Sequence, residues 1–551
     1  MRGVLRETEW TGKKYMSFLD VRYAYSIDQE NRFSPPKPLT LAEEDVFPAD
    51  QESIVCANLN TLERIDATYN ETIEDCLYLT VSTKNLTGSA PVMVHLAGWN
   101  LVTEENSNDH SNPGFLLEED VVLVSVQYRV GPFGFLSTMT NDIPGNVGIL
   151  DVIEALRWVQ KHISHFGGNP KQVTLFGQFH SAAIIHILTL TPLLENEVLF
   201  HKVIYQSGSA LIPELINTDP KVMVKTMAKY LQIESEDIAE INKGFKEASA
   251  YELLRAYKQV VGKKKEFPLI VVGDPNGILP EEPKVMLKKR LNRAYPTMGG
   301  VVEQPSVCLS EDMDDLSGNK PPKKEDDKSE ESSEESTEKL IADKRKKPEE
   351  DHINSIHELI TSSANVFKDV LILDVPTNGE QAKYIESLFP KKIFASNFIK
   401  NILPAIIDIN SLPIKEATLK ALKYNIAKGG KAYLYAFNFN PVSSRLSCGD
   451  DVYVVQLGDD DIFLFPQEDV NLKNLNKQEK RLAKLMVELW TSFATTGQPE
   501  AHSLHVWPPL KFGINGPYFI IDTIHKLGFD YTEEYFSGLR AQKNEIDIVD
   551  L

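Results

Sequence analysis

The sequence lacks an apolar run of the roughly 18 to 20 residues that a membrane-spanning helix requires. Its opening stretch, MRGVLRETEWTGKKYMSFLD, contains no apolar core of a signal peptide and enters a folded pattern at once. Two expectations stay open: a cytoplasmic protein, or a mature or partial chain whose targeting segment has been left out.

Basic residues are scarce relative to acidic ones. The 551 residues include 58 Lys and Arg against 79 Asp and Glu, which gives a formal net charge of −21 at pH 7. Because nucleic-acid phosphates and anionic lipids would repel such a chain, the charge argues against both as partners. The 42% hydrophobic and 25% charged residues are otherwise typical of a globular protein.

Cysteine is rare as well, and the residues by themselves suggest reduced thiols. None of the four cysteines forms the closely spaced pairs that zinc sites use. We therefore expect neither a metal site nor a cofactor. The cysteines are Cys56, Cys76, Cys308 and Cys448.

Short β-branched runs alternate with helical patterns over roughly the first 309 residues. Buried strands are predicted over 91–98, 120–131 and 171–177, and an amphipathic helix over 148–168. Strand, helix and strand in this order predict an α/β fold with a large, mostly parallel twisted sheet and helices on both faces.

The composition changes sharply between residues 310 and 352. This stretch is rich in Glu, Ser and Lys and almost devoid of apolar residues, so it cannot bury enough surface to offset the entropy of ordering. We interpret it as a disordered acidic loop. Composition alone is equally compatible with a boundary between two domains and with an insertion inside one.

Two matches to the N-glycosylation pattern Asn-x-Thr flank Cys76. They place candidate glycosylation sites at Asn70 and Asn85. A chain of this length should contain a few such matches by chance, so they indicate a secreted protein only weakly.

The stretch VTLFGQFHSAAIIHILTL, from Val173 to Leu190, joins a strand to a helix. Many hydrolases carry the turn Gly-x-Ser-x-Gly at such a junction, with a nucleophilic serine at its apex. Here Phe179 occupies the serine position, and a phenyl ring has neither a lone pair for attack nor a proton to give up.

Several further stretches resemble segments of the carboxylesterase and cholinesterase family, which has the α/β-hydrolase fold, and they occur in the family's order along the chain. The resemblance spans nearly the whole chain apart from the acidic loop. It implies a single domain over 1–551, interrupted at 310–352. The stretches are FLDVRYA with RF at Arg32, EDCLYLTV, QYRVGPFGFLS, PGNVGILD, RWVQKHISHFGGNPKQVTLFG, YQSGSAL and LWTSFATTGQP.

The resemblance also carries the family's triad onto this chain. The nucleophile falls on Phe179 and the histidine base on Cys448, in SCGDDVYVV. The acid falls on Pro305, although a slip of two residues would offer Glu303. With all three positions replaced, the chain is not expected to be an enzyme.

The family's oxyanion loop, a histidine followed by glycines, reads HLAGWN here, so Leu96, Ala97 and Gly98 are its remnant. Because His180 and Ser181 are larger than the usual neighbours of the nucleophile, we expect the turn to be relaxed. Rescue of catalysis by either is disfavoured, since a helix-capping serine and a satisfied histidine are the simpler interpretations.

Two disulfides follow from the resemblance. Cys56 and Cys76 match the family's first disulfide pair, which favours an oxidising compartment. Cys448 takes the base position and Cys308 lies three residues beyond the acid position, and these two positions meet in active relatives, so we expect the two sulfurs to be close and to form a disulfide. Two unrelated buried thiols are the alternative.

Family members that keep the fold and lose the triad resemble neurotactin and glutactin. This likeness implies an extracellular or cell-surface adhesion or scaffold protein that binds another, unidentified protein. The alternatives are a pseudoenzyme that binds a small apolar ligand in the remnant gorge, and an ester hydrolase with a rearranged site. Relatives often dimerise through carboxyl-terminal helices, here including KLMVELWTSFATTG, so a homodimer is expected by resemblance.

Overall fold

The computed structural model describes fourteen stretches of the chain. They all belong to one compact unit, formed by Met1–Asn319 and Ser411–Leu551. The acidic segment 310–352 lies outside them, so the single interrupted domain over 1–551 stays a prediction. The described residues are 2–25, 27–39, 55–63, 73–98, 101, 112–264, 270–289, 293–303, 411, 413–441, 455, 457–466, 471–502 and 506–532.

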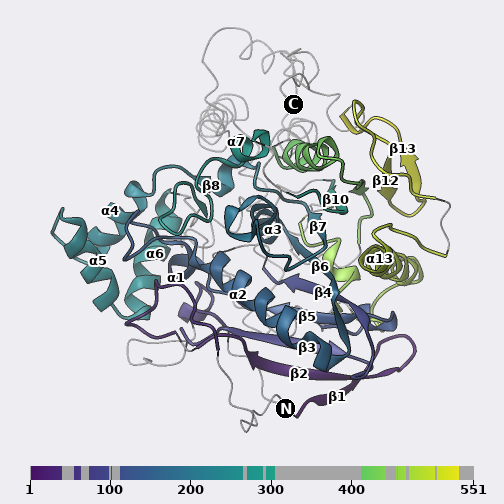
Figure 1. Ribbon diagram of the computed structural model, residues 1–551, viewed down its shortest axis with the longest axis horizontal. Helices are drawn as coiled ribbons and strands as arrows, with labels where there is room; N and C mark the ends of the chain where they lie inside the picture. The colour runs from purple at the N-terminus through teal and green to yellow at the C-terminus, as the bar shows by residue number, and fades with distance from the viewer. Residues whose placement is uncertain are drawn as a thin grey trace, which may run out of the picture. The chain divides into compact units, whose positions relative to one another are not determined.

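An eleven-stranded sheet runs through the unit (Figure 1). The strands are parallel to their neighbours from β5 through β12, and pairing is antiparallel among β1, β2, β3 and β5 and between β12 and β13. The mostly parallel sheet predicted from the sequence is confirmed. In spatial order the strands are β1 (Val4–Glu7), β2 (Lys14–Arg22), β3 (Tyr78–Thr83), β5 (Val122–Val126), β4 (Ala90–Leu96), β6 (Gly168–Gln178), β7 (Lys202–Gln206), β10 (Thr297–Val302), β11 (Ala432–Phe437), β12 (Tyr518–Ile521) and β13 (Lys526–Gly528).

Helices and short 3₁₀ turns connect the strands of the sheet. A helix over 413–427 and a separate two-stranded sheet, β8 (Ile216–Asn217) with β9 (Ile270–Val271), complete the described elements. The α-helices are α1 (Gly131–Phe135), α2 (Val147–His162), α3 (His180–Leu190), α4 (Lys221–Tyr230), α5 (Ile238–Glu247), α6 (Ala250–Lys264), α7 (Pro283–Lys288) and α13 (Lys477–Thr496). The 3₁₀ helices are η1 (Thr61–Glu63), η2 (Leu116–Glu118), η3 (Ile163–Phe166), η4 (Pro192–Leu194), η5 (Pro213–Leu215) and η6 (Asp461–Phe463).

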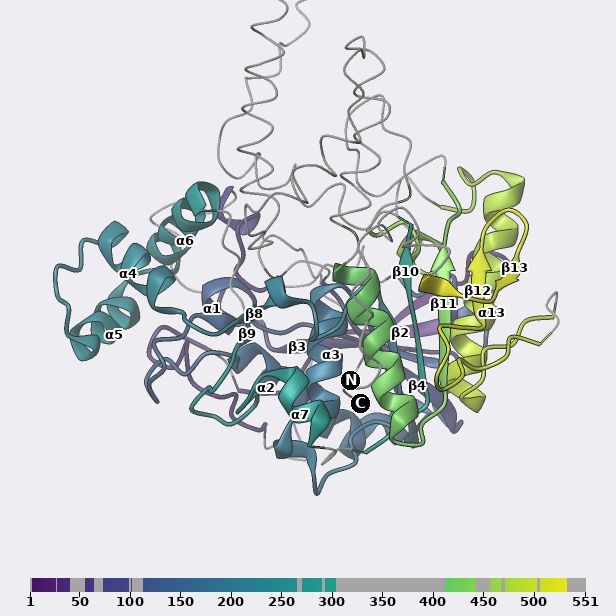
Figure 2. The same cartoon turned by 90° about the horizontal axis from the view of Figure 1, so that it is seen from above.

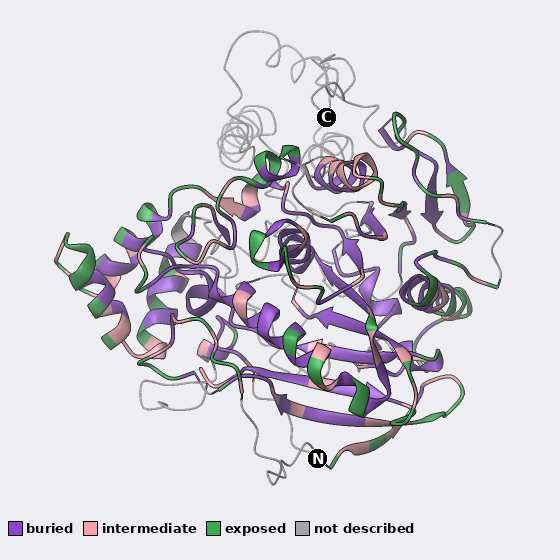
Figure 3. Ribbon diagram, viewed as in Figure 1, coloured by how far each residue is buried: buried purple, intermediate pink, exposed green. Residues whose placement is uncertain are grey.

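A separate apolar core lies against each face of the sheet, because successive side chains along a strand point to opposite faces. On β4, Val92 and Val94 join apolar residues of α2 and α3, whereas Met93 joins those of α13. We call these the α2–α3 core and the α13 core. Figure 3 shows the central strands buried along their length, while exposed residues lie on the outer side of α2. Helices therefore cover both faces, as predicted.

The helix predicted over 148–168 is present in two parts. The α-helix α2 ends at His162, the tighter turn η3 continues to Phe166, and Gly167 ends it with a φ of 75°. A side chain at Gly167 would also place its Cβ 1.8 Å from the carbonyl oxygen of Asn85. Glycine therefore allows the turn between β3 and β4 to pack directly on the end of α2.

A smaller group of helices lies to one side of the sheet. Figures 1 and 2 both show α4, α5 and α6 together there. They share a separate apolar cluster that includes Met227, Phe245 and Tyr257, each fully or almost fully buried. Because this cluster is distinct from the two sheet cores, these helices pack on one another and on α1 and neighbouring loops.

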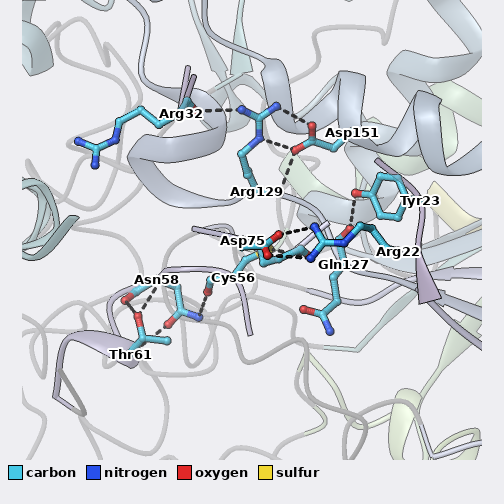
Figure 4. The surroundings of a disulfide bond; sticks show 11 residues. Arg22, Tyr23, Arg32, Cys56, Asn58, Thr61, Asp75, Gln127, Arg129 and Asp151 are labelled. Atoms are coloured by element: carbon cyan, nitrogen blue, oxygen red, sulfur yellow. Dashed lines mark hydrogen bonds and ion pairs between the residues drawn. A yellow bond between two sulfur atoms is a disulfide. The ribbon is translucent and has the colours of Figure 1, made fainter. Parts of the chain in front are cut away.

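The predicted disulfide between Cys56 and Cys76 is present, with Cα atoms 5.0 Å apart. Figure 4 shows it among charged groups that connect the loops before β3 to β2. Arg22 donates to both carboxylate oxygens of Asp75, at 2.6 and 2.8 Å. The 20-residue separation predicts that the bridge stabilises the fold by about 3 kcal/mol through loop entropy.

Candidate functional site

The turn between β6 and α3 lies at the carboxyl end of the parallel strands, where α/β enzymes usually carry their reactive groups. Gln178 is the last residue of β6, His180 is the first of α3, and Phe179 stands between them. Its backbone has φ 47° and ψ −102°, a conformation that residues with a side chain rarely adopt. The expectation of a relaxed turn is wrong: the strained elbow is retained.

Close packing on two glycines explains why the strain persists. A Cβ at Gly208 would lie 2.2 Å from the carbonyl oxygen of Phe179. A Cβ at Gly177 would lie 2.8 Å from Cβ of Ser181. Because Gly208 approaches the backbone of Phe179 and Gly177 approaches Ser181, the turn has little room to relax, whatever side chain stands at its apex.

The side chain at the apex is buried. Phe179 is 4% exposed and belongs to the α13 core, with its ring edge-to-face against His180 at a centroid distance of 4.8 Å. The elbow therefore presents a hydrocarbon surface where a hydroxyl group would be needed for attack on a carbonyl.

Ser181 is buried in the first turn of α3. The sequence suggested that it caps this helix, but it does not. Its hydroxyl donates to the carbonyl oxygen of Gly98 and lies 3.0 Å from the hydroxyl of Tyr128. No side chain caps α3. Ser181 therefore ties the elbow helix to the loop after β4.

The predicted oxyanion remnant follows β4 directly. Leu96 and Ala97 are buried, and Leu96 belongs to the α2–α3 core. Gly98 has a φ of 112°, and its carbonyl accepts the bond from Ser181. The preceding His95 packs against the rings of Phe176 and Phe465, at centroid distances of 4.8 and 4.4 Å, and these two rings also contact each other, so the imidazole is part of an aromatic cluster.

Of the remaining residues assigned to the triad or its surroundings, the structure describes only Glu303. Pro305, Cys448 and Cys308 lie outside the described residues, so the acid and base positions and the second disulfide stay predictions. Glu303, the alternative acid, follows β10, and its backbone N–H donates to the carbonyl of Phe437 at 2.9 Å. Asn70 also lies outside the described residues.

Sequence reasoning missed a buried carboxyl group beside the elbow. Asp460 has no exposed surface, and its Oδ1 accepts a hydrogen bond from Nε2 of Gln178 at 2.7 Å. Its Oδ2 accepts from Nε2 of Gln206 at 3.3 Å and from the hydroxyl of Tyr435 at 3.1 Å. Asp460 thus joins the ends of β6 and β7 to β11.

This environment changes the acidity of Asp460. Burial raises the pKa of its carboxyl group from 3.8 to about 6, and the neighbouring charge of Asp461 adds to the rise. Hydrogen bonds from Gln206 and Tyr435 oppose the rise because they favour the charged form. The net result is a carboxyl group that changes charge in mildly acidic conditions.

A repeated motif could have revealed this carboxyl group. The sequence contains Gly-Asp-Asp twice, at Gly449 and again at Gly458. In the second copy the residue before the glycine is Leu457, which is buried in the same α13 core as Phe179. Leu457 thus precedes the second Gly-Asp-Asp as Cys448 precedes the first, and neither residue carries an imidazole.

Two pockets lined by described residues lie away from the elbow. One has about 600 Å³ and borders α13, and the other has about 180 Å³ and borders the end of α3. Phe179 lines neither. Within the described stretches, no group of three or more His, Cys, Asp or Glu side chains is placed to hold a metal ion. None of the helices in those stretches combines the length and apolar character needed to cross a bilayer.

Comparison with known proteins agrees with this architecture. The family model described as "Carboxylesterase family" matches residues 1–535. Glutactin of Drosophila melanogaster is 29% identical over 511 residues, which is 89% of this chain and 46% of glutactin. Pyrethroid hydrolase Ces2a of Mus musculus is 28% identical over 83% of this chain and 73% of its own length. Acylcarnitine hydrolase of Rattus norvegicus is 32% identical over 55% of this chain and 54% of its own.

The extent of these matches is uneven. The chain spans less than half the length of glutactin but most of the length of Ces2a. The family match, in contrast, covers nearly every residue, including the whole eleven-stranded sheet with the elbow after β6. This chain belongs to the carboxylesterase family.

Proposed function

We propose that this chain is a non-catalytic carboxylesterase-like domain that acts outside the cell as an adhesion or scaffold protein. The observation that carries the proposal is the buried phenyl ring of Phe179 at the apex of a retained elbow. Without a hydroxyl there, the turn has no group to hold an acyl intermediate.

Three further observations support an extracellular binding role. The Cys56–Cys76 disulfide is of the kind that persists in oxidising compartments. The similarity to glutactin covers 89% of this chain. The net charge of −21 favours encounter with a basic surface. The partner is therefore an extracellular or cell-surface protein with a basic face.

The catalytic half of the proposal is tested with an ester substrate. We expect the purified full chain to hydrolyse a short-chain aryl ester no faster than its heat-denatured control, and to remain unlabelled by a fluorophosphonate probe for nucleophilic serines. Turnover that disappears in a Ser181→Ala variant would establish a rearranged hydrolase and overturn the proposal.

The binding half is tested with beads coated with the full chain. We expect the beads to adhere to extracellular matrix or cell surfaces, and to be released as added salt screens the acidic surface. Beads coated with an active carboxylesterase from the same family are the matched control. Equal retention of the two kinds of bead would contradict a specific adhesive role.

A further inference from the structure

A groove with a mixed polar and apolar lining lies at the end of the sheet opposite the elbow. Its volume is about 600 Å³, within the range of roughly 300 to 1,000 Å³ that small ligands occupy. Ala90 and Pro91 at the start of β4 line it, whereas the elbow follows the last residue of the parallel neighbour β6. We call it the β4–α13 groove, lined by the turn residues Asn85, Gly88 and Ser89 and by Thr491, Ser492 and Thr495 of α13.

We propose that Asn85 carries an N-linked glycan whose first sugars lie in the β4–α13 groove. The proposal rests on the extracellular location given above, because this modification occurs along the secretory route. It assigns the groove a covalently attached occupant rather than a diffusing ligand.

The local geometry at Asn85 suits the modification. Asn85, Leu86 and Thr87 are all exposed in the turn between β3 and β4. The side-chain oxygen of Asn85 accepts bonds from the backbone N–H and the hydroxyl of Thr87, both at 3.0 Å. Within the described part of the chain, its Nδ2 donates no hydrogen bond, so the amide nitrogen is not held by another protein group there.

The chemistry of attachment is a transfer from a lipid-diphosphate-linked oligosaccharide. Nδ2 of Asn85 attacks the anomeric carbon of the first sugar, forming a carbon–nitrogen bond. The bond between that carbon and the diphosphate oxygen breaks, the lipid diphosphate leaves with the electron pair, and Nδ2 loses one proton. No oxidant or reductant is needed.

The groove wall formed by α13 presents oxygen acceptors to the sugars. The hydroxyl of Thr491 donates to the carbonyl of Val487 at 2.7 Å, and that of Thr495 donates to Thr491 at 2.8 Å. Ser492 likewise donates to the carbonyl of Glu500 at 2.7 Å. The hydrogens of all three hydroxyls are used within the protein. Thr491 is buried and the oxygen of Ser492 accepts the backbone N–H of Glu500 at 2.8 Å, so among these three the exposed Thr495 offers the most accessible oxygen to a sugar hydroxyl.

The base of the glycan would be held in a fixed direction. The carbonyl of Asn85 packs on Gly167 at the end of α2, and the backbone N–H of Ala90 donates to the carbonyl of Gly167 at 2.9 Å. Because the turn is fixed at both points and Asn85 itself lines the groove, its first sugars would enter the groove rather than extend freely into solvent.

Occupancy is tested on the full chain expressed in animal cells behind an added secretion signal. We expect mass spectrometry to find a glycan on the peptide that contains Asn85. Asn85→Gln and Thr87→Ala should abolish it, whereas Thr87→Ser should retain it because serine also completes the acceptor pattern. A secreted, folded chain with an unmodified Asn85 would overturn the inference.

The position of the sugars is tested by enzymatic removal of the glycan from the native protein. Filling the groove by Thr495→Trp should speed its release about tenfold, the factor by which loss of about 1.4 kcal/mol of contact changes an equilibrium. The matched control is Gln478→Trp, at an exposed residue of α13 that does not line the groove. Equal release rates in all three proteins would show that the sugars do not lie in the groove.

Failure of this inference can be distinguished from failure of the proposed function. The added signal imposes passage through the secretory route, so occupancy of Asn85 there is independent of where the natural protein resides. Material from the natural source, assayed for the oxidised Cys56–Cys76 bridge and for its compartment, tests the extracellular location separately. Reduced cysteines in that material would overturn the location, whereas an oxidised bridge with a bare Asn85 would overturn only the glycan.

Discussion

The elbow and the region around the disulfide match the sequence-based expectations to different degrees. Cys56 and Cys76 form the predicted disulfide, and this covalent bond and the Arg22–Asp75 ion pair connect the loops there. At the elbow the turn between strand and helix has a strained backbone, and Phe179 stands at its apex. A turn can thus stay strained without a reactive side chain at its apex when neighbouring residues, here Gly177 and Gly208, pack closely against it.

Among the changes that test this comparison, replacing Phe179 should have the largest effect on the free energy of unfolding. Phe179→Ala removes a ring that is 4% exposed, and we expect the free energy of unfolding to fall by about 3–5 kcal/mol. Phe179→Gly loses the same ring but relieves the backbone strain at φ 47°, so it should be about 1 kcal/mol more stable than Phe179→Ala. Denaturant unfolding measures both. A glycine variant less stable than the alanine variant would show that the turn is not strained.

Removing the disulfide should be the next largest change. Cys56→Ala combined with Cys76→Ala should lower the free energy of unfolding by about 3 kcal/mol, because the unfolded chain regains the freedom of a 20-residue loop. Thermal unfolding with and without reductant checks it. If reductant destabilised the double variant as much as the parent, the effect would come from elsewhere in the chain.

The buried carboxyl group of Asp460 should make stability depend on pH. Because its folded pKa is raised to about 6 from 3.8, the unfolded chain releases this proton first as pH rises. The free energy of unfolding should therefore fall by up to about 3 kcal/mol between pH 4 and pH 6, with no further loss from this group above that range.

Asp460→Asn isolates this contribution. The introduced amide stays neutral and can donate to Oε1 of Gln206, which accepts no hydrogen bond among the described residues. We expect the variant to be more stable than the parent at pH 7, and the two to converge near pH 4. Parallel denaturation series at both pH values measure this. A constant difference between the two proteins would show that Asp460 has an ordinary pKa.

Ser181→Ala should give the smallest change. The partly buried carbonyl of Gly98 loses its hydroxyl donor, so the free energy of unfolding should fall by about 1 kcal/mol. Ser181→Thr keeps the hydroxyl and serves as the matched variant. If Ser181 ties the elbow to the loop after β4, alanine should also increase hydrogen exchange at the start of α3, and unchanged exchange would contradict that role.

Much of the fold follows from local sequence. The apolar runs at 91–98 and 171–177 predict the buried strands β4 and β6, because parallel strands covered on both faces need side chains of that kind. The elbow was located by its junction between a strand and a helix. Its relaxed form was predicted wrongly, since the size of His180 and Ser181 suggested loose packing, whereas the controlling contact comes from Gly208 on another segment.

The sequence by itself determined that a phenyl side chain occupies the turn after β6. The residue type at position 179 is given directly by the sequence, and the turn is predicted from the strand and helix patterns on either side. Only the tertiary structure decided what surrounds it. Gln178 and Asp460 are separated by 282 positions along the chain, yet they are joined by a 2.7 Å hydrogen bond. Such a contact depends on how the strand ends converge in three dimensions, and no local spacing of residues encodes that convergence.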